Sequence, residues 1–391
     1  MRYLWHHLYA ILDTYRNELP LHHFLKSYYR NQPKLGSRDR RALSDAVYAW
    51  YRCGKALGND IHTREEQILA ALFLCGLRPK AFGNLFPEAW APLWESTLHA
   101  RMEQLKTDGY AVALEQLFPY PDLQFSQAIM RTEWLESITG QPRLFLRIRK
   151  NADKIERVLK QAGIPFEWIT TTCLALPNGT AIDQLILPDA YVVQDASSQA
   201  TGAFFKPAAN EQWWDCCSGA GGKSLLLKDL LPTVRLLATD VRESILRNLK
   251  QRFLSYDYPA PVTAVLDAAD EEAVRAKMGP RLFDGIICDV PCTGSGTWAR
   301  TPESLYFFDP EILSTYTERG TAILRHAADY LKPDGKLVYI TCSVFRAENE
   351  AVVEKVAVEK GLRIEQVQLI NGIARQADCL FVAVLMREGR A

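Results

Sequence analysis

The spacing of apolar residues changes twice along the chain and divides it into three regions. In residues 1–118, apolar side chains such as Leu4, Leu8 and Ile11 recur every three or four positions, which predicts amphipathic helices. Residues 119–190 mix short alternating stretches with one helical stretch. From residue 191 onward, short apolar runs alternate with helical stretches, a pattern typical of a doubly wound, mostly parallel sheet. We therefore expect a helical domain, a small α+β domain and an α/β domain at 191–391.

The boundaries of the expected elements follow from these runs and from the residues that punctuate them. Ser37 is a candidate cap for a helix, and Gly163 is a candidate stop for a helix over 152–163. In the third region the expected helices are 222–231, 243–255, 310–331 and 348–360. The expected strands are 212–217, 235–239, 262–266, 283–289, 336–341, 363–369 and 380–386.

One strand of the small region alternates apolar and basic side chains. Residues 143–149 carry this pattern, which predicts a half-exposed strand. Its basic face would present Arg147 and Arg149, followed by Lys150. Such a face could contact RNA phosphates, or it could simply be solvated.

The strand expected at 283–289 ends in a group of reactive residues. Asp289 closes an apolar run, and a proline, Cys292 and a glycine-rich turn follow. A second cysteine, Cys342, follows the strand expected at 336–341. In open α/β sheets, ligands bind beyond the carboxyl ends of the strands. We therefore expect chemistry at this edge, where two cysteines about fifty residues apart could share one pocket.

The first strand-to-helix turn of the third region is rich in glycine, which predicts a ligand at a helix N-terminus. It lacks the Walker spacing and the full dinucleotide fingerprint. Asp240 ends the next strand, where it could bind ribose hydroxyls, and Asp267 ends the third, where it could bind the amine of a base. Together they indicate an adenosine-containing ligand, and S-adenosylmethionine fits better than NAD. The residues of the turn are Cys217, Ser218, Gly219, Ala220, Gly221, Gly222 and Lys223.

The residues at the strand ends suit methylation of cytosine. C5 of cytosine is a poor nucleophile until another group adds to C6, and a thiolate is able to add there. An acid that engages N3 promotes the addition, and a base must then remove the C5 proton. Cys342, Asp289 and Cys292 supply a thiol, an acid and a second thiol at the expected edge.

Composition narrows the class of protein. Apolar residues make up 48% of the 391 residues, and no apolar run is long enough to predict a membrane helix. The N-terminus lacks the order of a signal peptide, so we expect a cytoplasmic protein. The nine cysteines include no Cys-x-x-Cys pair, and we expect no metal site. Net charge is zero, but residues 1–55 carry ten Lys or Arg against four Asp or Glu, which favours RNA binding or a solvated helical face equally.

These motifs resemble the RsmB/Sun family of RNA (cytosine-5)-methyltransferases over the C-terminal two thirds of the chain. The paired segments Asp289-Val-Pro-Cys292 and Thr341-Cys-Ser343 distinguish this family from DNA cytosine methyltransferases, in which the Pro-Cys cysteine is the nucleophile. Residues 119–190 resemble the small RNA-recognition-like subdomain of the family, and residues 1–118 show a weak resemblance to a NusB-like helical domain. The matching segments are 193–199, 215–224, 239–240, 267, 289–296, 300–302, 341–343 and 348–350.

The resemblance implies a Rossmann-like class I S-adenosylmethionine methyltransferase fold and assigns roles to the site residues. Cys342 would be the nucleophile and Cys292 would assist product release, while Asp289 would contact the cytosine and border the cofactor. The cofactor would lie on residues 217–223, with its ribose on Asp240 and its adenine near Asp267.

The sequence departs from the family pattern at three positions, and none of them removes a catalytic group. Ala220 stands where the family usually has proline, Thr293 follows Cys292 in place of serine, and Cys379 opens a segment that is usually Gly-Phe-Phe. We therefore expect a monomeric enzyme that methylates a cytosine of small-subunit ribosomal RNA through a Cys342–C6 adduct. The alternatives are the same chemistry on transfer RNA, or a non-catalytic RNA-binding or ribosome-assembly factor.

Overall fold

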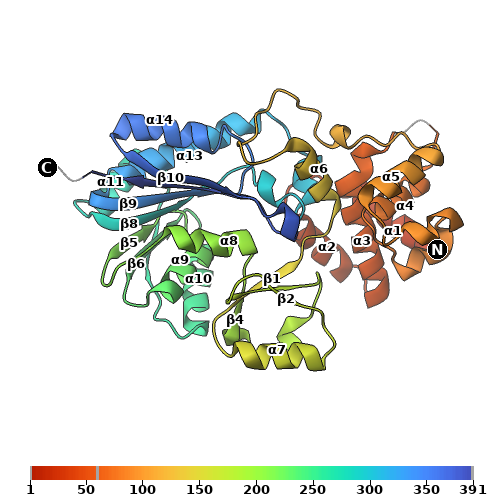
Figure 1. The fold of residues 1–391 in the computed structure, drawn as a ribbon, viewed down its shortest axis with the longest axis horizontal. Coiled ribbons are helices and arrows are strands. Elements are labelled where there is room, and N and C mark those ends of the chain that lie inside the picture. Colours follow the sequence, from red (N-terminus) through yellow and green to blue (C-terminus); the bar gives the residue numbers. More distant parts are fainter. Residues whose placement is uncertain (1, 59–60, 389–391) are drawn as a thin grey trace. The chain divides into compact units, whose positions relative to one another are not determined.

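The computed structural model describes residues 2–58 and 61–388, which are drawn in Figure 1. The chain forms two compact units. The first consists of Met1–Leu123, Met130–Gln141 and Thr297–Pro310. The second consists of Gln124–Ile129, Pro142–Gly296 and Glu311–Ala391.

The first unit is helical, as the apolar spacing predicts. Its core is built around α3 and α4, which bury side chains such as Leu43, Val47 and Phe73. Glu303 is also buried, and its Oε1 accepts a hydrogen bond of 3.1 Å from the Leu21 backbone N–H. The α-helices are α1 Arg2–Thr14, α2 Leu21–Arg30, α3 Ser37–Cys53, α4 Arg64–Leu74, α5 Leu98–Thr107, α6 Arg131–Thr139 and α12 Pro302–Tyr306.

The prediction that Ser37 caps a helix is wrong by one position. Ser37 is the first residue of α3, and Gly36 occupies the cap. The Asp39 carboxylate compensates for the missing cap side chain, because it accepts a hydrogen bond of 3.4 Å from the Gly36 N–H.

The second unit contains the seven-stranded sheet that the alternating pattern predicts. Its order is β10-β11-β9-β8-β5-β6-β7, and β11 runs antiparallel to the other six strands. This confirms a doubly wound α/β fold. The strands are β5 Gln212–Asp215, β6 Arg235–Asp240, β7 Val262–Val265, β8 Phe283–Asp289, β9 Leu331–Thr341, β10 Arg363–Ile370 and β11 Leu380–Met386.

Successive residues of the central strands point to opposite faces of the sheet and build two cores. Ile286 of β8 and Tyr339 of β9 belong to one core, whereas Ile287 and Val338 belong to the other. Helices α13 and α14 cover the first face, and α9 and α10 cover the second (Figure 1). The helices of this part of the unit are α8 Ala196–Ala200, α9 Gly222–Leu230, α10 Glu243–Ser255, α11 Glu271–Met278, α13 Ile312–Ala328 and α14 Glu350–Lys360.

The remainder of the second unit is a small antiparallel sheet of order β2-β3-β1-β4 with helix α7. The strand β1 is not half-exposed, because four of its five residues are buried. Arg147 lies among them and pairs with Asp229 of α9, so the prediction of an exposed phosphate-binding face is wrong for Arg147. The elements are β1 Leu144–Ile148, β2 Glu167–Trp168, β3 Cys173–Leu176, β4 Tyr191–Val193 and α7 Ala152–Gln161.

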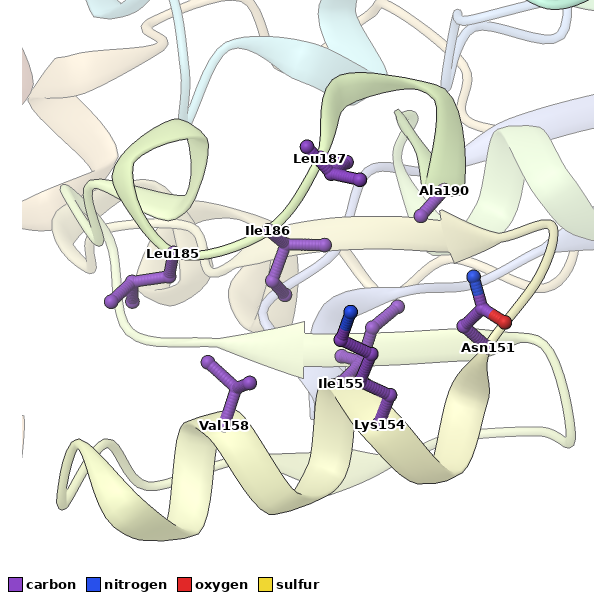
Figure 2. Close-up of a pocket in the computed structure, with 8 residues that line it drawn as sticks. All are labelled: Asn151, Lys154, Ile155, Val158, Leu185, Ile186, Leu187 and Ala190. Atoms are coloured by element: carbon purple, nitrogen blue, oxygen red, sulfur yellow. The ribbon is translucent and has the colours of Figure 1, made fainter.

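A small apolar crevice runs between α7 and residues 185–190 (Figure 2). Its volume is about 70 Å³, and Ile155 and Val158 of α7 form one wall. Leu187 forms part of the opposite wall and is 68% exposed.

In the described part of the chain, no helix has the length and apolar character needed to span a bilayer.

The pairing of β5 with β8 places a glycine where no side chain fits. Gly285 lies opposite Trp213, and a Cβ added to Gly285 would lie 2.2 Å from Trp213 Cε2. The Trp213 ring is fully buried and therefore has no free space to move into.

We expect Gly285→Ala to lower the free energy of unfolding by about 1–3 kcal/mol, because overpacking a dense core forces its neighbours apart. Urea unfolding followed by tryptophan fluorescence measures this change. Gly83→Ala is the control, because a Cβ at Gly83 meets no atom within 4 Å. An equal unfolding free energy for Gly285→Ala and the wild type would contradict the packing argument.

Candidate functional site

The two cysteines at the strand ends lie side by side. The strands β8 and β9 are parallel neighbours, and Asp289 pairs in register with Ile340. Both strands therefore end at the same edge of the sheet, and Cys292 and Cys342 follow within a few residues. Their Sγ atoms are 3.4 Å apart, and both side chains are half-buried. The convergence predicted from the sequence is present in the structure.

The two thiols share a hydrogen bond in which either sulfur could be the donor. A hydrogen bond with Cys342, together with burial, raises the pKa of Cys292 well above its ordinary value. The negative charge of Glu348 acts in the same direction. The Cys292 thiol therefore loses its proton less readily than an ordinary cysteine thiol.

A buried carboxylate joins the two cysteine loops. Glu348 is 2% exposed and accepts hydrogen bonds from the Thr293 N–H at 2.7 Å and the Thr293 hydroxyl at 2.6 Å. It also accepts one from the Ser343 hydroxyl. Burial raises the pKa of Glu348, although these hydrogen bonds act in the opposite direction. The sequence placed Glu348 in a motif but did not reveal that it connects the two loops.

Two further groups hold the loops in place. Asn349 donates hydrogen bonds of 2.9 Å to the Ser343 carbonyl and to the Ser126 hydroxyl. The Gly296 N–H donates to the Cys342 carbonyl at 2.8 Å, and the Gly296 carbonyl accepts from the Cys379 N–H at 2.9 Å. A Cβ at Gly296 would lie 2.1 Å from the Cys379 carbonyl oxygen, so only glycine allows this close approach.

An ion pair connects the glycine loop with the end of β8. Lys223 Nζ lies 2.6 Å from Asp289 Oδ2, and the Lys223 side chain is 11% exposed. Burial alone would lower the pKa of Lys223, but the Asp289 charge and hydrogen bond outweigh it and raise that pKa. Lys223 therefore stays protonated and holds Asp289 beside the two cysteines.

The glycine loop leaves its backbone open on one side. Gly219 and Gly221 have φ values of +50° and +81°, which favour glycine. A Cβ at Gly221 would lie 2.8 Å from Leu249 Cγ, so this residue faces the core. A Cβ at Gly219 or Gly222 would meet nothing within 4 Å, so a ligand is able to approach there. Cys217 and Ser218 precede these glycines, and Ala220 is exposed between them.

The loop rests on a buried acid at the end of β5. The Asp215 carboxyl is 1% exposed and accepts a hydrogen bond of 2.6 Å from the Ser224 hydroxyl. Burial and repulsion from Asp289 raise the pKa of Asp215 to about 7, against the opposing effect of the Ser224 hydrogen bond.

Two acids are predicted to bind an adenosine. Asp240 is the last residue of β6, and Asp267 lies just after β7. Asp240 accepts a hydrogen bond of 3.0 Å from the Gly219 N–H, so it is adjacent to the glycine loop. Burial would raise its pKa, but hydrogen bonds from Arg242 and Gly219 lower it. Asp267 is half-exposed and accepts from Arg319 Nη2 at 2.8 Å. Hydrophobic periodicity indicates neither arginine partner.

Part of the chain matches a known family. Residues 203–378 match the family model described as 16S rRNA methyltransferase RsmB/F, so this segment is similar to the proteins of that family. The match begins just before β5 and ends before β11, so it includes both cysteines, Lys223 and Glu348. It covers less than half of the 391 residues.

Relatives of known name agree with this family. The ribosomal RNA small subunit methyltransferase B of Shewanella oneidensis is 32% identical over 197 residues, which cover 50% of this chain and 44% of that protein. The protein of the same name from Xylella fastidiosa is 34% identical over 162 residues, covering 41% and 38%. The chain thus spans less than half the length of these two relatives.

Solved structures share the fold at low sequence identity. The crystal structure of PH0851 has a TM-score of 0.70 and 17% identity, and the similarity covers 98% of this chain and 97% of that one. The crystal structure of NSun6 from Pyrococcus horikoshii with SFG has a TM-score of 0.58 and 15% identity, covering 71% and 97%.

The residues at this site fit S-adenosylmethionine, the cofactor expected from the sequence. The open backbone at Gly219 and Gly222 suits the close approach of a ligand, and Asp240 and Asp267 offer carboxylate oxygens beside it. Among the residues that the structure describes, no cluster of three His, Cys, Asp or Glu side chains is arranged to hold a metal ion.

We expect Cys342→Ala to lower the pKa of Cys292, because it removes the hydrogen bond that contributes most to its elevation. The rate of iodoacetamide labelling of Cys292, measured by peptide mass spectrometry from pH 7 to pH 10, should rise at a lower pH in the variant. Cys217 is the internal reference, since its raised pKa depends on Cys216 and burial. Coincident pH profiles for Cys292 in the two proteins would refute this interpretation of the thiol pair.

Proposed function

We propose that the protein methylates C5 of a cytosine in small-subunit ribosomal RNA, with Cys342 as the nucleophile. The observation that carries the proposal is the pair of Sγ atoms 3.4 Å apart beside the Lys223–Asp289 ion pair. The RsmB/F match supports ribosomal RNA as the substrate. The weaker candidate, a non-catalytic assembly factor, would need neither thiol.

The chemistry begins at the cytosine ring. The Cys342 thiolate forms a bond from Sγ to C6, and the electron pair of the C5–C6 double bond makes C5 nucleophilic. N3 becomes more basic as this bond forms and takes up a proton from solvent through Asp289, while Lys223 holds the Asp289 carboxylate in position. S-adenosylmethionine, when bound, supplies the activated methyl group that C5 attacks.

Product release requires loss of the C5 proton. Its removal restores the ring double bond and expels the Cys342 sulfur. We assign this step to Cys292, after its own proton has passed to solvent, because its raised pKa makes its thiolate a strong base. This division of roles is the one that the resemblance to the RsmB/Sun family implies for the Pro-Cys and Thr-Cys segments.

The residues that surround the cofactor would hold it in position relative to the cytosine. Backbone between Cys217 and Lys223 would hold the cofactor, Asp240 would bind its ribose hydroxyls, and Asp267 would lie near its adenine. The RNA base would have to leave its stack to reach both thiols.

We expect Cys342→Ala to abolish methyl transfer, with a loss of at least about 10³-fold, because no other group forms the bond to C6. Transfer of a radiolabelled methyl group to small-subunit ribosomal RNA measures the loss. Equilibrium binding of S-adenosylmethionine should be unchanged, which separates a chemical defect from a folding defect. Normal turnover by Cys342→Ala would rule out Cys342 as the nucleophile.

We expect Cys292→Ala to accumulate a covalent protein–RNA adduct, because the C5 proton is no longer removed and Cys342 stays bound to C6. Denaturing gel electrophoresis of protein mixed with RNA and S-adenosylmethionine detects the adduct. The double variant Cys292→Ala with Cys342→Ala is the matched control. An adduct of equal yield in the double variant would show that another residue attacks the base.

The identity of the target can be read directly from cellular RNA. Bisulfite sequencing of RNA from cells with and without the protein should reveal one or more cytosines in small-subunit ribosomal RNA that resist conversion to uracil only when the protein is present. If cytosines lose this resistance in transfer RNA alone, the substrate is transfer RNA and the proposed reaction is unchanged.

A further inference from the structure

A second cavity in the catalytic unit lies outside the site described above. Its volume is about 210 Å³, well above the ~10–15 Å³ that a buried water needs. Its walls come from β1, residues 169–173, α8 and the segment at 370–377 that follows β10. All of these segments belong to the same compact unit.

Arg147, one of the residues that line the cavity, is a buried cation with an unused donor. The Arg147 side chain is 6% exposed, and its Nε donates a hydrogen bond of 2.8 Å to Gln194. Its Nη1 donates to Asp229. Its Nη2 is buried and has no hydrogen-bond partner in the described part of the chain. An unpaired buried donor on a charged group is costly unless a ligand satisfies it.

The charge balance around Arg147 also favours an anion. Asp229 is shared, because Arg149 Nη2 lies 3.0 Å from its second carboxylate oxygen. All three of these side chains are at most 15% exposed, so two guanidinium groups face one carboxylate in a poorly hydrated place. No acidic side chain lines the cavity among the residues described, and Arg375 adds an exposed guanidinium at its rim.

Gln199, another residue that lines the cavity, has an unused acceptor. Gln199 Oε1 is buried without a hydrogen-bond partner, while the Gln199 amide nitrogen donates to the Gln194 carbonyl at 2.8 Å. A donor from a guanidinium suits a phosphate oxygen, and an acceptor suits a hydroxyl. RNA carries a phosphate and a 2′-hydroxyl on every nucleotide, and the 2′-hydroxyl is absent from DNA.

The cavity wall continues into the catalytic loops. The segment at 370–377 leads to Cys379, whose N–H donates to the Gly296 carbonyl at 2.9 Å, and the Gly296 N–H donates to the Cys342 carbonyl at 2.8 Å. An RNA strand held in the cavity would therefore contact a segment that is hydrogen-bonded to the proposed nucleophile's loop.

We propose that this cavity binds one nucleotide of the RNA substrate outside the catalytic pocket, with its phosphate on Arg147 and Arg375 and its 2′-hydroxyl on Gln199. The proposal rests on the proposed function, which supplies RNA as the ligand. The site would position the strand and distinguish RNA from DNA without reading the base.

The test measures binding of the full chain to small-subunit ribosomal RNA as a function of salt. Arg375→Ala and Arg147→Lys should each weaken binding about tenfold. Arg375→Ala should also reduce the slope of log K against log salt by about 0.7, the value for one phosphate contact on a single strand, whereas Arg147→Lys keeps the charge and should leave the slope unchanged. Arg363→Ala is the matched control. It is an exposed arginine at the opposite end of β10, roughly 23 Å from Ile370 at about 3.3 Å per residue, and should change neither quantity.

The acceptor is tested by the choice of nucleic acid. Gln199→Met should lower affinity for a single-stranded RNA and leave affinity for the DNA strand of the same sequence unchanged, so that the preference for RNA falls. Thermal unfolding of each variant checks that it is folded. Should Arg147→Lys fail to fold, Arg375→Ala decides, because its side chain lies on the surface.

Three outcomes would overturn the proposal. One is unchanged affinity and salt slope in both folded arginine variants, and another is an unchanged preference for RNA in Gln199→Met. The third is thermal stabilisation of the wild type by inorganic phosphate that Arg147→Lys abolishes while RNA binding stays normal, which would assign the cavity to a free anion. Methyl transfer is measured in parallel, because absence of methylation by the wild type would reject the proposed function and not the cavity.

Discussion

The parallel pairing of β8 with β9 is the constraint on which the site depends. Two strands in register end at the same level, so the residues that follow them must share one small volume. The backbone ladder therefore brings together two cysteines that are fifty positions apart in sequence. Side-chain contacts refine the arrangement afterwards, through the Glu348 hydrogen bonds and the close approach at Gly296.

An ion pair adds a further connection at this edge of the sheet. Lys223 comes from the glycine loop and Asp289 from the end of β8, so their ion pair joins the glycine loop to the strand end that precedes Cys292. Asp215 lies beneath the same loop, and its raised pKa reflects the burial of a carboxyl near another carboxylate. Lys223 is thus surrounded by acids and by sulfur, which keeps its pKa high despite burial.

Local sequence patterns predicted those elements whose signals are local. The strands Phe283–Asp289 and Leu380–Met386 and the helix Glu243–Ser255 have the predicted bounds, because apolar runs and helical periods define them. Arg147 was misplaced because its partner Asp229 lies 82 residues further along the chain. The role of Glu348 in joining the loops was missed for the same reason, since Thr293 is 55 residues away. Long-range polar contacts leave no trace in the periodicity of a sequence.

The helical unit takes one of its segments from the middle of the catalytic sequence. Thr297–Pro310 belongs to that unit, although Gly296 directly before it belongs to the other. Trp298 is buried in the segment, and Phe307 packs against the helical core. The chain therefore passes between the units several times, and no single cut yields two intact pieces. A shortened chain that begins near residue 191 would keep both cysteines but expose these aromatic side chains to water, so aggregation is its expected fate. Exchange of the helical unit between relatives would likewise require a matching replacement within the catalytic sequence.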